Sequence, residues 1–278
     1  MNDTALNTLS GPVVLLGAGK MGGAMLDGWL KLGLPADKAI VLDPHLPEEG
    51  AEAFAARGVR VNPPQESIET PAVLIIAVKP QVAPDALPPV AGLAKAQTLV
   101  VSVMAGRSLA FLESHFAPGT AIVRVMPNTP AAIGRGVSVA VPNSAVVPEL
   151  RSLTTVLLSA VGTAEWLEDE GLIDAVTGVS GSGPAYIFLL AEAMAAAGVA
   201  AGLPEDLSAR LARATVSGSG ALLDESDLDA ATLRKNVTSP GGTTAAALAV
   251  LMDETKGFGP LLTEAIAAAA RRGRELAG

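Results

Sequence analysis

The feature that most constrains the fold is a glycine-rich turn between a buried strand and a helix. Residues 12–16 (PVVLL) form an apolar run that is typical of a buried strand. The turn Gly17-Ala18-Gly19-Lys20-Met21-Gly22 follows at once, and residues 23–32 carry apolar side chains at helical spacing. A second apolar run, residues 39–42, ends in Asp43. This order predicts a β-α-β unit with a dinucleotide-binding turn.

Each glycine of the turn has an expected task. Gly17 permits the tight turn, Gly19 lets a pyrophosphate approach the backbone, and Gly22 lets the helix pack on the strand. The alternatives are the phosphate loop of nucleoside triphosphatases and a tight turn that binds nothing. The phosphate loop is disfavoured because no Gly-Lys-Ser or Gly-Lys-Thr follows.

The alternation of strands and helices continues beyond this unit. Residues 48–57 are expected to be helical, and further strands are expected at residues 72–78, 98–103, 121–125 and 137–141. The fold class is therefore α/β, a Rossmann-like doubly wound parallel sheet of six to eight strands. It occupies residues 1–168, of which 1–10 are expected to be a disordered tail. Strand signals then vanish, so residues 169–278 are predicted to form an all-α domain.

Composition excludes several classes of function. The net charge is −9, and no basic run exceeds two residues, so nucleic acid is not an expected partner. No cysteine is present, which excludes disulfides, thiolate metal sites and a cysteine nucleophile. His45 and His115 are the two histidines, so a multi-histidine metal site is excluded and no metal is predicted. The N-terminus lacks a signal-peptide pattern, so a cytoplasmic protein without a membrane partner is expected.

Two helical segments are unusually apolar. Residues 184–203 contain one charge, Glu192, and residues 261–270 are rich in leucine and alanine. The first is long enough for a membrane span. Its alanine content and central Glu192 instead favour a helix buried in a core or in a subunit interface. The two segments together indicate a homo-oligomer.

The stretch Val237-Thr238-Ser239-Pro240-Gly241-Gly242-Thr243-Thr244 precedes a run of helix-forming residues, 245–252. Proline and paired glycines predict a tight turn, and the helix behind it directs free N–H groups and a positive dipole end at that turn. A plain helix N-cap would need one hydroxyl residue and no Gly-Gly pair. The pattern therefore favours a site for a small carboxylate or phosphate.

The two candidate sites together suggest an oxidoreductase that acts on a small acid. No His, Lys or Tyr clusters with the second turn, whereas alcohol oxidation needs a strong general base. Reduction of a cyclic imine does not, because its nitrogen can arrive already protonated. Alignment and hydrogen bonds from threonine hydroxyls would then be sufficient.

Five motifs, in order along nearly the whole chain, resemble the pyrroline-5-carboxylate reductase family. They are the turn at 17–22, Ala77-Val78-Lys79-Pro80, Met126-Pro127-Asn128-Thr129-Pro130, the segment 175–186 (AVTGVSGSGPAY), and the turn at 237–244. The last two are the specific ones. The resemblance implies an N-terminal Rossmann domain, a C-terminal helical dimerisation domain, and intertwined dimers that in such enzymes often assemble into rings such as a decamer. It implies reduction of 1-pyrroline-5-carboxylate to L-proline by NADPH or NADH, the last step of proline biosynthesis.

The resemblance also implies the site residues. Thr244 would bond the substrate ring nitrogen and is the expected catalytic residue, Asn236 would lie near the nicotinamide ribose, and Glu170 would come from the partner subunit. The substrate-binding set is Glu170, Asn236, Ser239, Gly242, Thr243 and Thr244. The cofactor-binding set is Gly17, Ala18, Gly19, Lys20, Met21, Gly22, Asp43, Pro44, Ala77, Val78, Lys79, Met104, Ala105, Gly106, Asn128 and Asn236.

Several alternatives stay open at this point. Asn128 fits a turn cap as well as a nicotinamide pocket, and Asp43 fits NADH, although family members often prefer NADPH. Asn62 is shifted in register by Pro63-Pro64 and is left out of the cofactor set. The rival functions are a reductase of another small imino or 2-hydroxy acid, for which Lys235 is the nearest acid–base candidate, and a regulatory protein that binds cofactor without catalysis.

Overall fold

The computed structural model describes residues 6–277. The chain divides into two compact units. We call Met1–Gly181 together with Ala270–Gly278 the sheet unit, and Ser182–Ala269 the helical unit.

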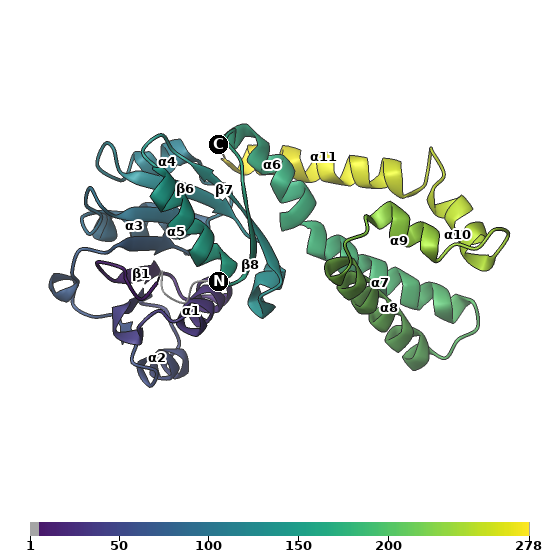
Figure 1. The fold of residues 1–278 in the computed structure, drawn as a ribbon, viewed down its shortest axis with the longest axis horizontal. Helices are drawn as coiled ribbons and strands as arrows, with labels where there is room; N and C mark the ends of the chain where they lie inside the picture. The colour runs from purple at the N-terminus through teal and green to yellow at the C-terminus, as the bar shows by residue number, and fades with distance from the viewer. Residues whose placement is uncertain (1–5, 278) are drawn as a thin grey trace. The chain divides into compact units, whose positions relative to one another are not determined.

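The sheet unit is built on eight strands in the order β3-β2-β1-β4-β5-β6-β7-β8 (Figure 1). Strands β3 to β6 in this order are all parallel, so the carboxyl ends of these strands share one edge of the sheet. The strands are β1 Val13–Leu16, β2 Ala39–Leu42, β3 Arg60–Val61, β4 Val73–Ile76, β5 Leu99–Ser102, β6 Ala121–Met126, β7 Gly136–Pro142 and β8 Gly162–Trp166.

The predicted Rossmann-like sheet is confirmed, with one correction at its far edge. Strand β7 runs antiparallel to β6, and β8 is parallel to β7. Between β6 and β7 the chain makes only the short 3-10 turn Thr129–Ile133, whereas a parallel return needs a crossover of about a dozen residues or more. Strands β3 and β8 lacked a clear apolar signal, because β3 has two residues and β8 alternates half-buried with exposed positions.

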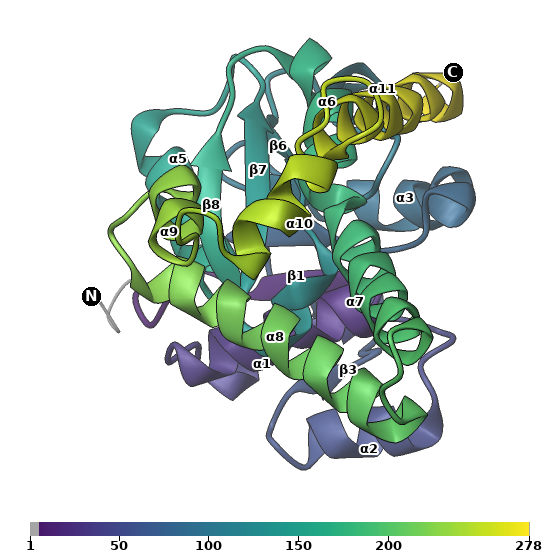
Figure 2. The same ribbon diagram turned by 90° about the vertical axis from the view of Figure 1, so that its right-hand side faces the viewer.

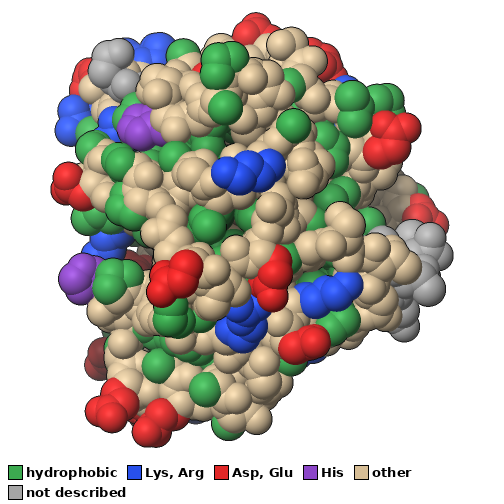
Figure 3. Space-filling model, turned by 90° about the vertical axis from the view of Figure 1, so that its left-hand side faces the viewer, with side chains coloured by type: hydrophobic (Ala, Val, Ile, Leu, Met, Phe, Trp, Pro, Cys, Tyr) green, Lys and Arg blue, Asp and Glu red, His purple; other side chains and the backbone are tan. Residues whose placement is uncertain are grey.

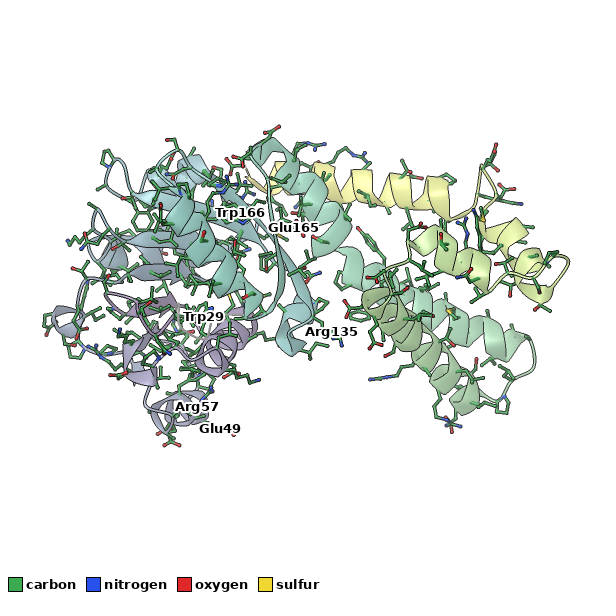
Figure 4. All side chains as sticks on the ribbon, viewed as in Figure 1. Trp29, Glu49, Arg57, Arg135, Glu165 and Trp166 are labelled. Carbon is green, nitrogen blue, oxygen red and sulfur yellow. The ribbon has the colours of Figure 1, made fainter. Side chains whose placement is uncertain are left out.

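Helices cover both faces of the sheet. Val13 and Leu15 of β1 point to the face covered by α1 and α5, and Val14 and Leu16 point to the face covered by α3 and α4. Trp29 of α1 is fully buried and donates its indole N–H to Leu157 O of α5, at 2.8 Å (Figure 4). The helices of this unit are α1 Lys20–Lys31, α2 Glu48–Ala55, α3 Ala83–Ala91, α4 Leu109–Glu113, α5 Pro148–Ser159 and α6 Ile173–Val176.

The described part of the N-terminal segment is not a disordered tail. Leu6 is 1% exposed and belongs to the core under α1. Lys38 donates from Nζ to the carbonyl of Leu9, at 2.6 Å. The expectation of a disordered tail at 1–10 is thus wrong for residues 6–10, because burial of Leu6 in the apolar core holds this segment on the sheet unit. Residues 1–5 lie outside the described residues.

The chain after β8 still packs on the sheet unit. Ile173 of α6 is buried with Val139 and Val141 of β7. A π-helical turn, Thr177–Gly181, follows, and the division between the units falls after it. Our expected boundary after residue 168 therefore precedes a segment whose contacts lie with the sheet.

The helical unit contains no described strand and is organised around a hairpin of α7 and α8, which lie side by side (Figure 2). Gly198 permits their close approach, since an added Cβ would overlap the hydroxyl of Ser208. The helices are α7 Gly183–Ala200, α8 Glu205–Glu225, α9 Ala230–Asn236, α10 Thr243–Leu251 and α11 Phe258–Ala277, the last of which ends in the sheet unit.

Helix α7 has no buried residue in the single chain. Phe188 and Leu189 are 62% and 63% exposed. Of the two environments that we predicted for it, a core and a subunit interface, only the interface agrees with this exposure. Residues 170–200 would also pass a membrane-span test by length and composition alone, a test that core helices of soluble proteins pass as well.

Candidate active site

The glycine-rich turn has the three predicted spatial properties. An added Cβ at Gly17 would lie 2.9 Å from the carbonyl carbon of Ala77, and one at Gly22 would overlap Gly17 O. Gly17 also has a φ of 91°, which favours glycine. An added Cβ at Gly19 would meet nothing within 4 Å. The backbone at Gly19 therefore faces open space at the start of α1.

The start of α1 is suited to an anion. Its N-cap is Gly19, no side chain caps it, and its first turn holds no acidic residue. Free N–H groups and the positive end of the helix dipole then favour a phosphate group. The residues present thus fit the pyrophosphate of a dinucleotide, with Gly17, Ala18, Gly19, Lys20, Met21 and Gly22 around it.

Asp43 follows β2 beside this turn, as predicted. Its Oδ2 accepts the Ala18 N–H at 2.9 Å, and its Oδ1 accepts the His45 N–H at 2.9 Å. Asn62, which is not among the predicted cofactor residues, exchanges two hydrogen bonds with the Asp43 backbone. Its position on the loop after β3 depends on strand pairing, and for that reason the linear register did not identify it.

The other predicted cofactor loops follow β4, β5 and β6. Lys79 and Pro44 are exposed, while Met104 is 2% exposed and packs in the core. Asn128 accepts the Val137 N–H on its Oδ1 at 2.9 Å, so in this structure it holds the start of β7, and its side chain does not cap the 3-10 turn that it begins. The loop segments Ala77, Val78 and Lys79, and Met104, Ala105 and Gly106, lie after neighbouring parallel strands.

Arg107 ties two of these loops together and was not predicted. Its guanidinium donates from Nε and Nη2 to Pro80 O, at 3.2 and 2.8 Å, and lies over the Phe111 ring at 4.6 Å. The segment after Lys79 is thereby joined to the segment after Gly106. A lone arginine after a glycine gave no sequence signal for this contact.

The second turn lies in the helical unit between α9 and α10. Gly241 has a φ of 69°, and an added Cβ at Gly242 would overlap the Ser239 hydroxyl. Gly242 is the N-cap of α10 and no side chain caps that helix. The turn brings Ser239, Gly242, Thr243 and Thr244 together at a helix start with free N–H groups, and Asn236 ends the preceding helix.

Glu170 is not part of this turn. It belongs to the sheet unit, where its Oε1 accepts from Arg124 Nη1 at 2.6 Å and from the Leu109 N–H at 2.8 Å. The Arg124 side chain is 8% exposed and that of Glu170 is 29% exposed. The carboxylate is therefore engaged within its own chain. An arginine in the apolar strand AIVRV was a visible signal that an acidic side chain would pair with it.

Among residues 6–277, no group of three or more His, Asp or Glu side chains is arranged to hold a metal ion. On the face of the sheet unit in Figure 3, Lys and Arg side chains lie among acidic ones and form no broad basic patch. The site features are two helix starts without a side-chain cap, one in each unit.

Comparison with known proteins supports this description of both units. A family model described as pyrroline-5-carboxylate reductase dimerisation matches residues 170–276, and one described as NADP oxidoreductase, coenzyme F420-dependent, matches residues 12–106. The solved structure of a pyrroline-5-carboxylate reductase from Coxiella burnetii is similar, with a TM-score of 0.89, 28% identity, and coverage of 97% of this chain and 99% of that chain. One from Plasmodium falciparum with NADP bound has a TM-score of 0.79 and 26% identity, and covers 97% of this chain and 99% of that chain.

Curated relatives share more sequence. The pyrroline-5-carboxylate reductase of Synechocystis is 46% identical, over 78% of this chain and 80% of the relative. That of Pseudomonas aeruginosa is 39% identical, over 95% of this chain and 96% of the relative. The cofactor turn, the second helix start and these matches all agree, and the chain belongs to the pyrroline-5-carboxylate reductase family.

Proposed function

We propose that this chain reduces 1-pyrroline-5-carboxylate to L-proline with NAD(P)H, the last step of proline biosynthesis. The observation that carries the proposal is the second turn. It offers an uncapped helix start flanked by hydroxyl groups, in a chain of this family. Such a start suits the carboxylate of a small imino acid.

The residues of the turn would bind and orient the substrate. Backbone N–H groups at the start of α10 hold the carboxylate, the Ser239 hydroxyl lies beside Gly242, and Thr243 follows Gly242 in the chain. The Thr244 hydroxyl hydrogen-bonds the ring nitrogen and so sets the orientation of the C=N bond. Bound NAD(P)H supplies the hydride to the ring carbon of that bond. The chain supplies alignment in place of a strong general base.

The cofactor would be held by the sheet unit. The backbone around Gly19 and the start of α1 take the pyrophosphate, and the loops after β4 and β5 flank it at the carboxyl edge of the sheet. Asn236, Glu170 and Asn128 remain proposed site residues. Glu170 Oε1 and Asn128 Oδ1 already accept hydrogen bonds within the sheet unit, so the proposed roles would fall to Glu170 Oε2 and Asn128 Nδ2.

The enzyme is an oligomer that acts on a small molecule, as its dimerisation domain and its relatives indicate. We extend this to a homodimer that assembles into a ring such as a decamer, located in the cytoplasm without nucleic-acid or membrane partners. The net charge of −9 supports the absence of nucleic acid.

The test is oxidation of NADH and NADPH by the purified protein on addition of 1-pyrroline-5-carboxylate, followed by nicotinamide absorbance, with proline identified by chromatography. Lys235→Met should leave turnover within about threefold, because imine reduction requires no lysine acid–base group. A protein that oxidises cofactor with a 2-oxo acid and not with the imine, and that loses this activity in Lys235→Met, would instead be a hydroxy-acid dehydrogenase. Cofactor binding without any turnover would favour the regulatory protein.

A further inference from the structure

The carboxylate of Asp43 is held in place by two backbone N–H groups. One comes from Ala18 inside the glycine-rich turn, and the other comes from His45 on its own loop, each at 2.9 Å. A freely rotating surface aspartate would not be tied to both segments. The negative charge of Asp43 is therefore fixed at the point where the turn meets the end of β2.

Asn62 holds the backbone of the same residue. Its Oδ1 accepts the Asp43 N–H at 2.8 Å, and its Nδ2 donates to Asp43 O at 2.9 Å. Asn62 itself has a φ of 45°, the only positive φ of a non-glycine residue among residues 6–277. Such a conformation is uncommon and is retained where the surroundings impose it. Three chain segments thus converge to position one carboxylate.

The loop and helix that follow Asp43 offer no basic side chain of their own. Residues 44–56 include no Lys or Arg, and Lys20 of the glycine-rich turn is the cation nearest in sequence to Ala18. The next two cations along the chain have partners of their own: Arg57 pairs with Asp27, and Arg60 pairs with Glu69. Figure 4 labels Glu49 and Arg57 at the α2 end of the unit. The loop after β2 therefore offers no Lys or Arg to a phosphate group.

We propose that Asp43 makes this enzyme select NADH over NADPH. An acidic residue at the end of the second strand of such a fold hydrogen-bonds a ribose 2′-hydroxyl and repels a 2′-phosphate. Here the carboxylate cannot swing away without losing the Ala18 and His45 bonds. Asn62 is the positioning residue. The inference rests on the proposed function for its context.

The experiment is equilibrium binding of NADH and of NADPH, each measured by nicotinamide fluorescence without any imine present. The wild-type protein should bind NADH at least about tenfold more tightly than NADPH, and Asp43→Asn should reduce this ratio to about threefold or less. The same ratios should appear in kcat/KM with the imine substrate. Asn62→Ala should reduce the ratio partly, with kcat at saturating NADH nearly unchanged.

Two further variants make the test specific. Glu49→Gln removes an equal charge from exposed α2 and should change the ratio less than about twofold, since its carboxylate is not part of the turn. His45→Arg keeps the backbone N–H and adds a cation, and should tighten NADPH binding even if Asp43→Asn fails to fold. Equal or tighter NADPH binding by the wild-type protein, or an unchanged ratio in Asp43→Asn, would overturn the proposal. A failure of imine reduction with intact NADH selectivity would overturn the proposed function alone.

Discussion

Arg124 is a charged residue in the middle of an apolar strand, and one acidic side chain compensates for the burial of its charge. It is 7% exposed as a whole residue, and Glu170, 46 positions away, accepts its Nη1 at 2.6 Å. The same carboxylate oxygen accepts the Leu109 N–H at the start of α4. One acidic side chain therefore joins β6, α4 and the segment after β8. Removal of the arginine would leave a half-buried carboxylate without its cationic partner.

We expect Arg124→Met to lower the free energy of unfolding by roughly 2 kcal/mol, because a hydrogen bond to a charged, partly buried group is lost. Glu170→Gln should cost less, since the amide oxygen can still accept from Leu109. The measurement is urea unfolding at one fixed protein concentration. If Glu170→Gln left stability intact and raised only the KM for the imine, Glu170 would be a substrate residue and this pairing would be secondary.

Thr244 is the residue at which chemistry and binding can be separated. It lies in the first turn of α10, in the helical unit, whereas the glycine-rich turn lies in the sheet unit. Thr244→Ala should lower kcat about 10- to 100-fold, because its hydroxyl orients the ring nitrogen only in the bound substrate. Cofactor affinity, measured by fluorescence, should stay within about twofold. Thr244→Ser should recover much of the rate, and a large loss of cofactor affinity in Thr244→Ala would contradict the assignment.

At the scale of elements, the hairpin of α7 and α8 depends on a small residue. An added Cβ at Gly198 would overlap the hydroxyl of Ser208, which is 2% exposed and donates to Ala195 O at 2.6 Å. Cores that are already filled accept no extra methyl group without displacement of their neighbours. The close crossing of the two helices therefore requires glycine at this position.

Gly198→Ala should cost about 1–3 kcal/mol of unfolding free energy through overpacking. Ser208→Ala alone should cost about 1 kcal/mol, since the carbonyl that loses its hydroxyl donor lies within a helix. The double variant should lose less unfolding free energy than the sum of the two single losses, because the removed hydroxyl makes room for the methyl group. Strict additivity in this double-mutant cycle would show that the two side chains do not compete for space.

Helix α9 leads into the second turn and is capped by Asp229. The backbone N–H of Thr232 and then its hydroxyl hold the pKa of Asp229 below its usual value. A lowered pKa in the folded state gives stability that is present above the unfolded-state pKa and is lost as pH falls through the folded-state pKa.

The stability difference between wild type and Asp229→Ala should therefore be constant above about pH 5 and should shrink toward pH 3. Asp229→Asn keeps an acceptor for the helix start but does not titrate in this range. Its difference in stability from Asp229→Ala should therefore stay constant with pH. Denaturant unfolding across this pH range measures both variants. A difference that grows on acidification would have the opposite sign and would exclude the cap as its source.

At the scale of the whole molecule, the helical unit exposes large apolar side chains on several of its helices. Phe188 of α7 is 62% exposed, Val250 of α10 is 66% exposed, and Leu261 of α11 is 55% exposed. Large exposed apolar patches of this kind mark protein interfaces. This exposure agrees with the dimerisation family that matches residues 170–276.

Light scattering after size exclusion should give a mass of two subunits or a multiple of two. Phe188→Asp should reduce that mass and the activity together, since a charge in an apolar interface is strongly unfavourable. Val147→Asp is the matched control, because Val147 is 49% exposed in the sheet unit and is the N-cap of α5, where aspartate is favoured. A monomeric wild-type protein at micromolar concentration would refute the interface.

Much of the fold was predictable because its signals are local. The apolar runs at β1, β2, β4, β5 and β6 placed these strands within about two residues, and the glycine-rich turn fell between β1 and α1 as expected. The direction of β7 was not predictable from its apolar pattern, since parallel and antiparallel strands read alike along the chain. The antiparallel direction of β7 follows from the short connection between β6 and β7, which is too short for a parallel crossover.

The sequence by itself determined the strands with apolar signals, the two helix starts and the family, because these depend on residues adjacent along the chain. Only the tertiary structure decided which side chains act as pairs. Asn62 meets Asp43 because β2 and β3 are parallel neighbours, and Glu170 meets Arg124 because the segment after β8 returns to the sheet. Contacts between residues remote in sequence depend on the packing of whole elements, which no local pattern encodes.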